Sequence, residues 1–181
     1  FRNIIINGDM SIAQRGTSAT GLGNGDTGYH TCDRWQFSEG GTPTYEFTMS
    51  QSTDVPTGQG FAKSLKMDCT TAQASLGSAD NLRIPQKVEG QNLQYVKKGT
   101  SNAESLTCSF WVKSNKTGTY IVELYDNDNT RQISKSYTIS SADTWEKKTI
   151  TFAGDTTGAF DNDNARSFEL IYWLAAVANF Q

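Results

Sequence analysis

The sequence has little of what most metal-dependent, membrane-spanning or nucleic-acid-binding proteins rely on. Its 181 residues include 1 histidine, 3 cysteines and 3 prolines. Metal sites that need two histidines and zinc sites with four cysteines are therefore excluded. The longest apolar run, Leu170 to Ala178, is about half of what a bilayer span requires. Charged residues make up 19% of the chain and the net charge is −3, so no basic field attracts nucleic acid.

The sequence also lacks the usual signs of an enzyme. His30 is the single base available for a Ser–His or Cys–His relay, and it lies in a Gly-Tyr-His-Thr loop, where an ordinary surface position explains it better. The glycines at 21, 23 and 25 are not followed by the helical pattern that a phosphate-binding loop needs. We expect the protein not to be an enzyme.

Uncharged polar residues take the place of the missing charges. Thr, Ser, Gly and Asn together make up 67 of the 181 residues. Threonine and aromatic residues favour strands, whereas glycine and asparagine favour tight turns. This composition excludes a helical bundle and a coiled coil.

Apolar residues alternate with polar ones through most of the chain, which is the pattern of half-buried strands. About nine strands with turn residues between them predict two packed antiparallel sheets, a β-sandwich. Pro85 lacks a backbone N–H and predicts an edge or a bulge in its strand. The expected strands cover 3–7, 44–50, 61–69, 81–88, 105–112, 120–124, 133–139, 145–152 and 167–178.

The first thirty residues differ from the rest. A run of three isoleucines in 3–7 suits a strand buried on both faces or lying between subunits. Residues 15–28 hold five glycines and read as a long flexible loop. We expect an N-terminal arm and Gly-rich loop at 1–30 and a β-sandwich domain at 31–181. One short helix is predicted over 89–98, with Gly99 as its stop.

Two tryptophans are candidates for binding a sugar. Trp111 and Trp145 fall on the strand faces opposite the apolar rows, and a flat aromatic ring suits the C–H face of a sugar. The alternative is that the helix or the long loop covers both of them. Trp35 and Trp173 lie in more hydrophobic runs and read as core. Tyr125 completes the set of candidate carbohydrate-binding residues.

Acidic residues gather in the turns. Two identical Asp-Asn-Asp-Asn tetrads begin at residues 126 and 161. Turn geometry alone explains them, because Asp and Asn bond to nearby backbone and tolerate left-handed φ. A second interpretation is structural Ca²⁺, which takes oxygen ligands from such loops, and a third is a carboxylate pair of a glycosidase. The candidate calcium ligands are Asp126, Asp128, Asp161 and Asp163.

Two parts of the chain resemble known families. Residues 7–16, followed by Asp33-Arg34-Trp35, resemble a pattern of bacteriophage tail-fibre and related virion-appendage proteins. Residues 109–113, 144–148 and 154–158 resemble pieces of the jelly-roll carbohydrate-binding modules of the family 4/9 type. The resemblance implies a jelly roll on a phage particle that grips a host-surface glycan, with calcium as a structural ion.

The same resemblance implies partners and a location. Such fibres are usually trimeric homo-oligomers that contact other virion proteins and are assembled in the bacterial cytoplasm, without nucleic acid or membrane insertion. That agrees with the reading of Cys32, Cys69 and Cys108 as small buried hydrophobes rather than one disulfide plus a free thiol. Cys32 stands where the family has a small residue. The family also continues past the strand that ends this chain, so we expect either further sequence or a neighbouring subunit to supply the pairing edge.

These observations favour a non-enzymatic virion module that binds host carbohydrate. The alternative is a purely structural protein that decorates a capsid or attaches a fibre and has no ligand. The isoleucine-rich arm and the glycine loop favour that alternative, because a mobile arm can order on a neighbour.

Overall fold

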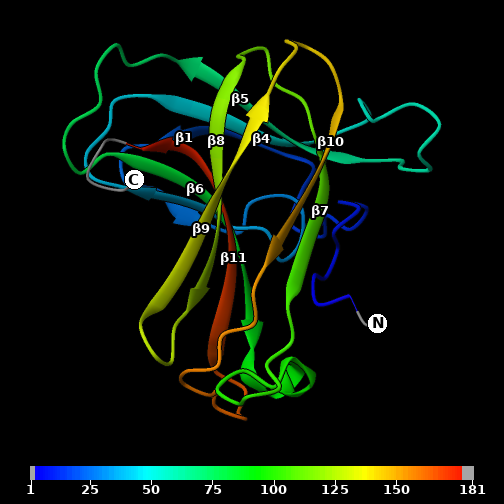
Figure 1. Ribbon diagram of the computed structural model, residues 1–181. Coiled ribbons are helices and arrows are strands. Elements are labelled where there is room, and N and C mark those ends of the chain that lie inside the picture. The colour runs from blue at the N-terminus through cyan, green and yellow to red at the C-terminus, as the bar shows by residue number, and fades with distance from the viewer. Residues whose placement is uncertain (1–2, 177–181) are drawn as a thin grey trace. The chain divides into compact units, whose positions relative to one another are not determined.

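The computed structural model describes residues 3–176, which form strands joined by turns and loops (Figure 1). Within these residues the chain divides into two compact units. The N-terminal unit contains residues 5–86 and 172–176, and the C-terminal unit contains residues 3–4 and 87–171. Each unit has its own core and is described by itself.

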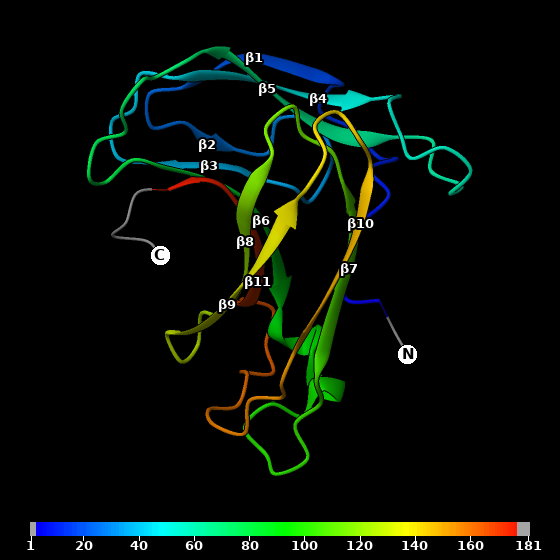
Figure 2. The same ribbon diagram turned by 45° about the horizontal axis from the view of Figure 1, so that its top comes forward.

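The N-terminal unit is built of two layers of antiparallel strands (Figure 2). One layer has the order β1-β4-β5 and the other contains β2, β3 and the first part of β6. Trp35, Phe37, Met49 and Leu82 are among the buried residues that form its core. The strands are β1 Ser18–Gly23, β2 Thr27–Gly28, β3 Phe37–Gly40, β4 Glu46–Ser52, β5 Ser64–Thr71 and β6 Asn81–Glu89.

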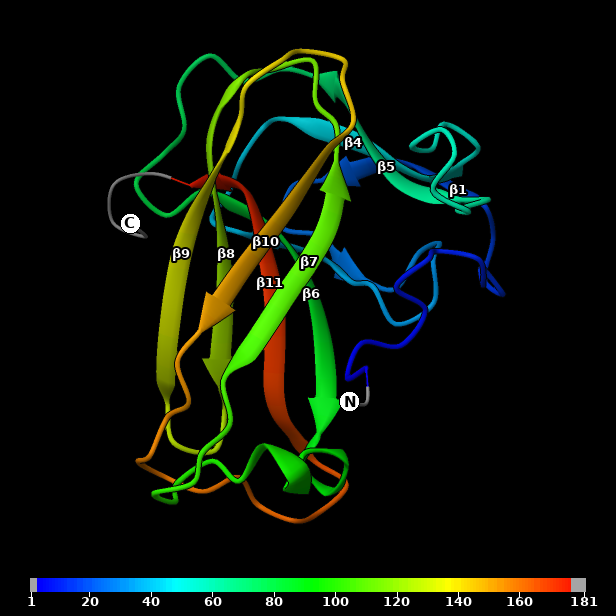
Figure 3. The same ribbon diagram turned by 45° about the vertical axis from the view of Figure 1, so that its right-hand side comes forward.

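The C-terminal unit also has two layers. The first part of β11 lies beside β8, which pairs with β9, while β10 and β7 pair with each other (Figure 3). Val122, Ile139, Phe152 and Phe168 are buried between them. The elements are β7 Leu106–Val112, β8 Gly118–Asp126, β9 Arg131–Ile139, β10 Glu146–Phe152, β11 Arg166–Ala176 and the 3₁₀ helices η1 Gly90–Asn92 and η2 Gln94–Val96.

The prediction of an all-β chain with several antiparallel sheets is confirmed. The alternation was read most accurately in β7 and β10, whose seven residues pair without a bulge from Glu146↔Val112 to Phe152↔Leu106. In β10 every second residue, from Glu146 to Phe152, is half-buried or buried and the residues between are exposed. The period of two therefore located both strands and their inward faces.

The expectation of a flexible loop over 15–28 is wrong. Strand β1 forms there and pairs with β4, with an irregularity between Ala19 and Leu22. Only Leu22 of this strand is buried. A lone buried apolar side chain among glycines carries too little periodicity to be recognised as a strand. The division into an arm at 1–30 and a sandwich at 31–181 stays a prediction.

The isoleucine run at 3–7 forms no strand either. In its place the buried Gln86 side chain acts as a strand neighbour: Ile6 N–H donates to Gln86 Oε1 at 2.8 Å, and Gln86 Nε2 donates to Ile6 O at 3.0 Å. Trp35 Nε1 donates to Asn7 O at 3.0 Å. Side chains therefore satisfy the backbone that a sheet would otherwise pair.

Two smaller expectations change. The helix over 89–98 is replaced by η1 and η2, with i→i+3 bonds from Leu93 N to Gly90 O and from Val96 N to Leu93 O, both 2.9 Å. Lys97 follows in the left-handed region at φ 53°, which ends the turn. Pro85 lies within β6, which has β3 and β11 as neighbours, so it is not on an edge strand.

Gln86 gives a testable prediction for stability. Replacing Gln86 by Leu keeps the volume but removes both bonds to Ile6, so we expect the free energy of unfolding to fall by about 1–3 kcal/mol. Urea denaturation measures this. The matched control is Gln91→Leu, because Gln91 is exposed and donates its backbone N–H, which the substitution keeps, to Asp163 O at 2.8 Å. Equal stability of the two variants would contradict the role of the Gln86 amide.

Candidate functional site

The outward side of the β7–β10 pair gathers aromatic rings, ammonium groups and hydroxyl groups. We call it the tryptophan face. Since successive strand residues point to opposite sides, the residues that alternate with the inward row share this face. The face therefore comprises Thr107, Ser109, Trp111, Lys113, Trp145, Lys147, Thr149 and Thr151.

Each tryptophan of this face lies across from a lysine. Trp111 is the pairing partner of Lys147, and the same register continued one step sets Lys113 opposite Trp145. The Lys113 ammonium nitrogen lies 5.7 Å from the centroid of the Trp145 ring, within the range of a cation–π interaction. Both tryptophans are half-buried, so neither is covered completely as the alternative interpretation required.

Hydroxyl groups extend the face along the strands. Thr107 Oγ1 and Thr151 Oγ1 lie 2.9 Å apart, and the Thr149 hydroxyl donates to Ser109 Oγ at 3.4 Å. All four residues are exposed. They form two cross-strand pairs whose remaining bonding capacity points to solvent.

The inward side of the same strands fixes the face in place. Phe110 packs edge-on against Tyr137 of β9, with ring centroids 5.1 Å apart, and Phe152 is buried. Burial raises the pKa of the Tyr137 hydroxyl. Glu146 also points inward, where Lys148 Nζ at 2.6 Å holds the pKa of its carboxyl below the usual value. The only acidic residue of the two strands therefore faces away from the tryptophans.

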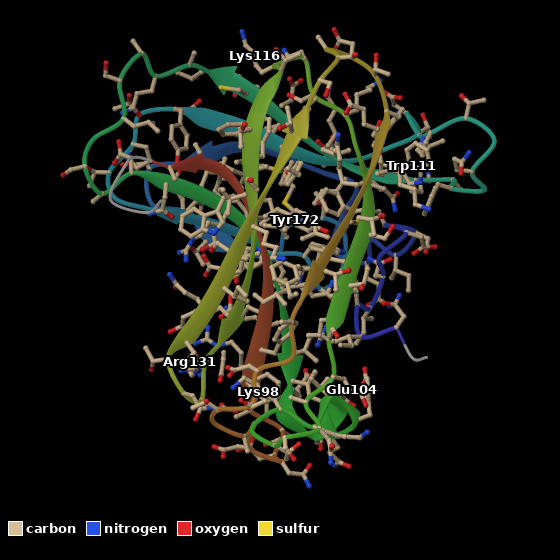
Figure 4. The ribbon with its side chains drawn as sticks, viewed as in Figure 1. Lys98, Glu104, Trp111, Lys116, Arg131 and Tyr172 are labelled. Carbon is tan, nitrogen blue, oxygen red and sulfur yellow. The ribbon has the colours of Figure 1, made fainter. Side chains whose placement is uncertain are left out.

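Tyr125, the third candidate sugar-binding residue, is not part of the tryptophan face. It lies on β8 and lines a cavity of about 300 Å³ together with Leu106, Ile133 and Phe160. Figure 4 shows Trp111 far along β7 from Lys98, Glu104 and Arg131, which line the same cavity. The structure brings Trp111 and Trp145 together and leaves Tyr125 apart.

A buried ion-pair network lies beside this cavity. Lys98 Nζ is 2.6 Å from Asp126 Oδ2 and 3.2 Å from Asp155 Oδ2, and the Lys98 and Asp126 side chains are 8% and 5% exposed. Arg131 donates to both carboxylate oxygens of Asp155, at 3.0 and 3.1 Å. This fork lowers the pKa of Asp155 to about 2. Lys98 also donates to the carbonyl of Gly158 at 2.6 Å, so the network ties three loops together.

The network matters for the carboxylate-pair hypothesis. Asp126 and Asp155 share one ammonium, but a glycosidase needs one carboxyl kept protonated as a general acid. Asp155 has a lowered pKa, the opposite of that requirement. The lowered pKa of Asp155 therefore does not suit the role of a general acid.

The carboxylates of three of the four candidate calcium ligands make other bonds, and Asp161 takes part through its backbone N–H. Asp126 pairs with Lys98, Asp128 accepts from Asp161 N–H at 2.9 Å, and Asp163 accepts from Ala165 N–H at 2.9 Å. Within residues 3–176 no group of three acidic, histidine or cysteine side chains is placed to hold a metal ion. The geometry supports the turn interpretation of the tetrads, and calcium binding stays a prediction.

The cysteines and His30 add no chemistry to the face. All three cysteines are free thiols; Cys32 is buried, and burial raises the pKa of its thiol. Cys69 is exposed on β5, so its reading as a buried hydrophobe is wrong. The His30 ring packs against Phe37 with centroids 6.2 Å apart.

Sequence reasoning missed the two lysines of the tryptophan face. Lys113 lies two positions after Trp111 and Lys147 two positions after Trp145 in the sequence, which places each lysine on the same face of the strand as its tryptophan. That spacing was the signal that could have found them. The tryptophan face includes no acidic or amide side chain.

Comparisons with known proteins add a likeness of fold. No family model matches the chain, and no curated protein matches it. Among solved structures, the enzymatically active domain of bacteriophage CBA120 tailspike protein 4 resembles it with a TM-score of 0.50 and 15% sequence identity. The likeness covers 87% of this chain and 19% of that chain, so the protein spans about a fifth of its length. At this identity the likeness concerns the fold.

No helix among the described residues is long and apolar enough to cross a membrane.

The buried Lys98–Asp126 pair predicts that replacing Lys98 lowers the free energy of unfolding strongly, whereas replacing the neighbouring Lys97 lowers it little. Lys98→Met leaves the Asp126 carboxylate unpaired, so we expect a loss of about 3–5 kcal/mol in the free energy of unfolding. Adding Asp126→Asn should recover much of it. Lys97→Met is the control, because Lys97 and Glu104 form an exposed pair whose loss costs about 1 kcal/mol or less. Similar losses at both lysines in guanidinium denaturation would refute the assignment.

The lowered pKa of Asp155 predicts that the stability of the fold depends on pH. Its pKa is lowered from 3.8 to about 2 in the folded chain, so it stabilises the fold above pH 4 and this contribution is lost as pH falls toward 2. With allowance for solvent screening, the loss is on the order of 1 kcal/mol. The free energy of unfolding of the parent and of Asp155→Asn, measured between pH 5 and 2, should converge. Parallel curves would exclude this role.

Proposed function

We propose that this protein is a virion-associated module that binds host-surface carbohydrate through the tryptophan face and is not itself an enzyme. The observation that carries the proposal is the placement of Trp111 and Trp145 beside exposed hydroxyl groups on one rigid strand pair. The likeness of fold to a phage tailspike domain supports the association with a virion. A jelly-roll strand order, as in carbohydrate-binding modules, belongs to the same proposal.

Sugar binding by this mechanism needs a flat apolar surface on a rigid backbone. A sugar ring that lies on an indole removes apolar area of both partners from water, at about 25 cal/mol per Å². Trp111 belongs to the paired backbone of β7 and Trp145 directly precedes β10, and Phe110 anchors this backbone from behind through its contact with Tyr137. Little rotamer freedom is therefore left to lose on binding.

Weak single contacts are sufficient when the module is repeated. We propose a homotrimer in which three copies engage one polymer, so that the second and third contacts form at a high effective concentration. Other virion proteins are further partners, and assembly takes place in the host cytoplasm.

The proposal of a non-enzymatic role follows from the carboxylates. Asp126 and Asp155 are occupied by Lys98 and Arg131, and Glu146 by Lys148. The tailspike domain of similar fold is described as enzymatically active, but this chain spans 19% of that protein. Release of reducing sugar from a bound polysaccharide would contradict the proposal.

A second candidate is a purely structural attachment protein. Ile6 and Ile12 in the N-terminal unit are 47% and 48% exposed, which is unusual for large aliphatic residues and suits docking on a neighbouring chain. A structure of the assembled particle in which another chain covers these isoleucines and both tryptophans would favour this candidate.

The binding proposal predicts the effect of removing the rings. Trp111→Ala together with Trp145→Ala should abolish binding of the assembled oligomer to host polysaccharide, measured by glycan array and calorimetry. Phe61→Ala is the control, since Phe61 is an exposed aromatic residue, 37% accessible, in the N-terminal unit. Undiminished binding of the double tryptophan variant would refute the proposal.

A further inference from the structure

We propose that the outer edge of β5 pairs with β5 of a second copy of this chain, antiparallel, about a twofold axis that passes through Met67. Strand β5 ends the order β1-β4-β5. Its pairing with β4 runs without a bulge from Ser64 to Cys69, so the other edge presents a regular row of backbone donors and acceptors. The opposite edge strand, β1, has an irregularity between Ala19 and Leu22 and suits such pairing less well.

The two faces of β5 differ in chemical character. Lys66 and Asp68 are exposed and share one face, because they lie two positions apart. Leu65 and Met67 share the other face and are half-buried, and Met67 is the pairing partner of the buried Met49. A second strand at this edge therefore meets charged groups on one side and apolar groups on the other.

The alternation of the backbone limits how two identical strands can pair. In an antiparallel ladder, a residue whose N–H and C=O point to the partner strand always faces a residue of the same kind. Such residues alternate along each strand. Two copies of one strand can therefore pair only when the axis between them passes through a residue, not between two residues.

Among the axes near the middle of β5, one brings opposite charges together. An axis at Lys66 sets two lysines against each other, and an axis at Asp68 sets two aspartates against each other. An axis at Met67 places Lys66 opposite the partner's Asp68 in both copies. On the other face, Met67 then lies opposite the partner's Met67, and Leu65 opposite the partner's Cys69. The strand is complementary to itself in this register.

The charges on the exposed face alternate in sign in this register. Within one chain, Lys66 Nζ lies 3.2 Å from Asp68 Oδ2, and the two side chains are 55% and 57% exposed. Pairing places the partner's Asp68 opposite Lys66, at about 5 Å between Cβ atoms. A lysine on an edge strand ordinarily opposes pairing. Here the aspartate two positions further on matches that lysine, so the edge accepts a copy of itself rather than an unrelated strand.

This contact is distinct from that of the proposed homotrimer. A twofold contact uses the same surface on both chains and closes with two of them, whereas a trimer needs another surface. If the chain is trimeric, β5 pairing joins one trimer to another.

Reversed charges test the contact by sedimentation equilibrium of the full chain. One strand pair is a small interface, so we expect association with a Kd on the order of 10–100 μM. Lys66→Glu alone and Asp68→Lys alone each set like charges opposite one another and should weaken the twofold contact by about tenfold or more. The two substitutions in one chain should restore it, and so should a mixture of the two single variants.

The matched control lies in the C-terminal unit. Lys97→Glu makes the same change of charge and breaks an exposed ion pair of the same kind, between Lys97 and Glu104. It should leave the association within about twofold of the parent. Circular dichroism of each variant shows whether it keeps the strand content of the parent.

A disulfide tests the register. Leu65→Cys places a thiol opposite Cys69 of the partner subunit, within the Cα separation that a disulfide needs, so oxidation should link two chains covalently. In the parent chain, Cys69 is a free, exposed thiol that lies four positions, about 13 Å, from the partner's Cys69. The parent should therefore not be linked, and neither should Leu65→Cys combined with Cys69→Ser.

Each contrary result overturns the inference. A chain that stays monomeric at about ten times the expected Kd has no such contact. A trimer or other oligomer that both single charge variants leave intact would agree with the proposed trimer and exclude β5 pairing. Oxidative linkage of the parent through Cys69 would exclude the axis at Met67. The carbohydrate-binding proposal stands or falls separately, because it depends on Trp111 and Trp145.

Discussion

The unbroken pairing of β7 with β10 is the constraint on which the candidate site depends. Seven residue pairs without a bulge keep every inward residue inward, so Phe110, Ile150 and Phe152 pack on one side over the whole length. A shift of one residue would turn the tryptophans into the core and the apolar row to solvent. The chemistry of the outer face is therefore a consequence of how firmly the inner face is packed.

Ion pairs hold together the loops at one end of the C-terminal unit, as apolar packing holds together the strands in its middle. Lys98 contacts Asp126 and Asp155 and also bonds backbone carbonyls, which satisfies a buried ammonium from several directions. Gly99, at φ 80°, allows the chain to turn there, and its N–H donates to Asp155 O at 2.9 Å. The loops that follow the 3₁₀ helices, β8 and β10 are joined in this way.

The sequence was most informative where the period of two was long and regular. It located β4 to β11 within a few residues because most of them have several alternating apolar positions, as β8 has in Tyr120, Val122 and Leu124. It failed for β1, where Leu22 is the only buried residue, and for the isoleucine run, where Gln86 replaces a strand by side-chain bonds. Such long-range bonds leave no local pattern. The period of two assigned Trp111 and Trp145 to the outward face of their strands. It did not show that Tyr125 lies apart from them, because the distance of Tyr125 from the tryptophans is set by tertiary packing.

The pairing of Trp111 with Lys147 and of Lys113 with Trp145 has a further consequence. The two strands run antiparallel, so the order from ring to cation along one strand repeats along the other in the opposite sense. The pattern has local pseudo-twofold symmetry. The symmetry is confined to these four residues, because the hydroxyl pairs Thr107–Thr151 and Ser109–Thr149 both lie at one end of them. The face as a whole therefore has a direction, from a hydroxyl end to an aromatic end.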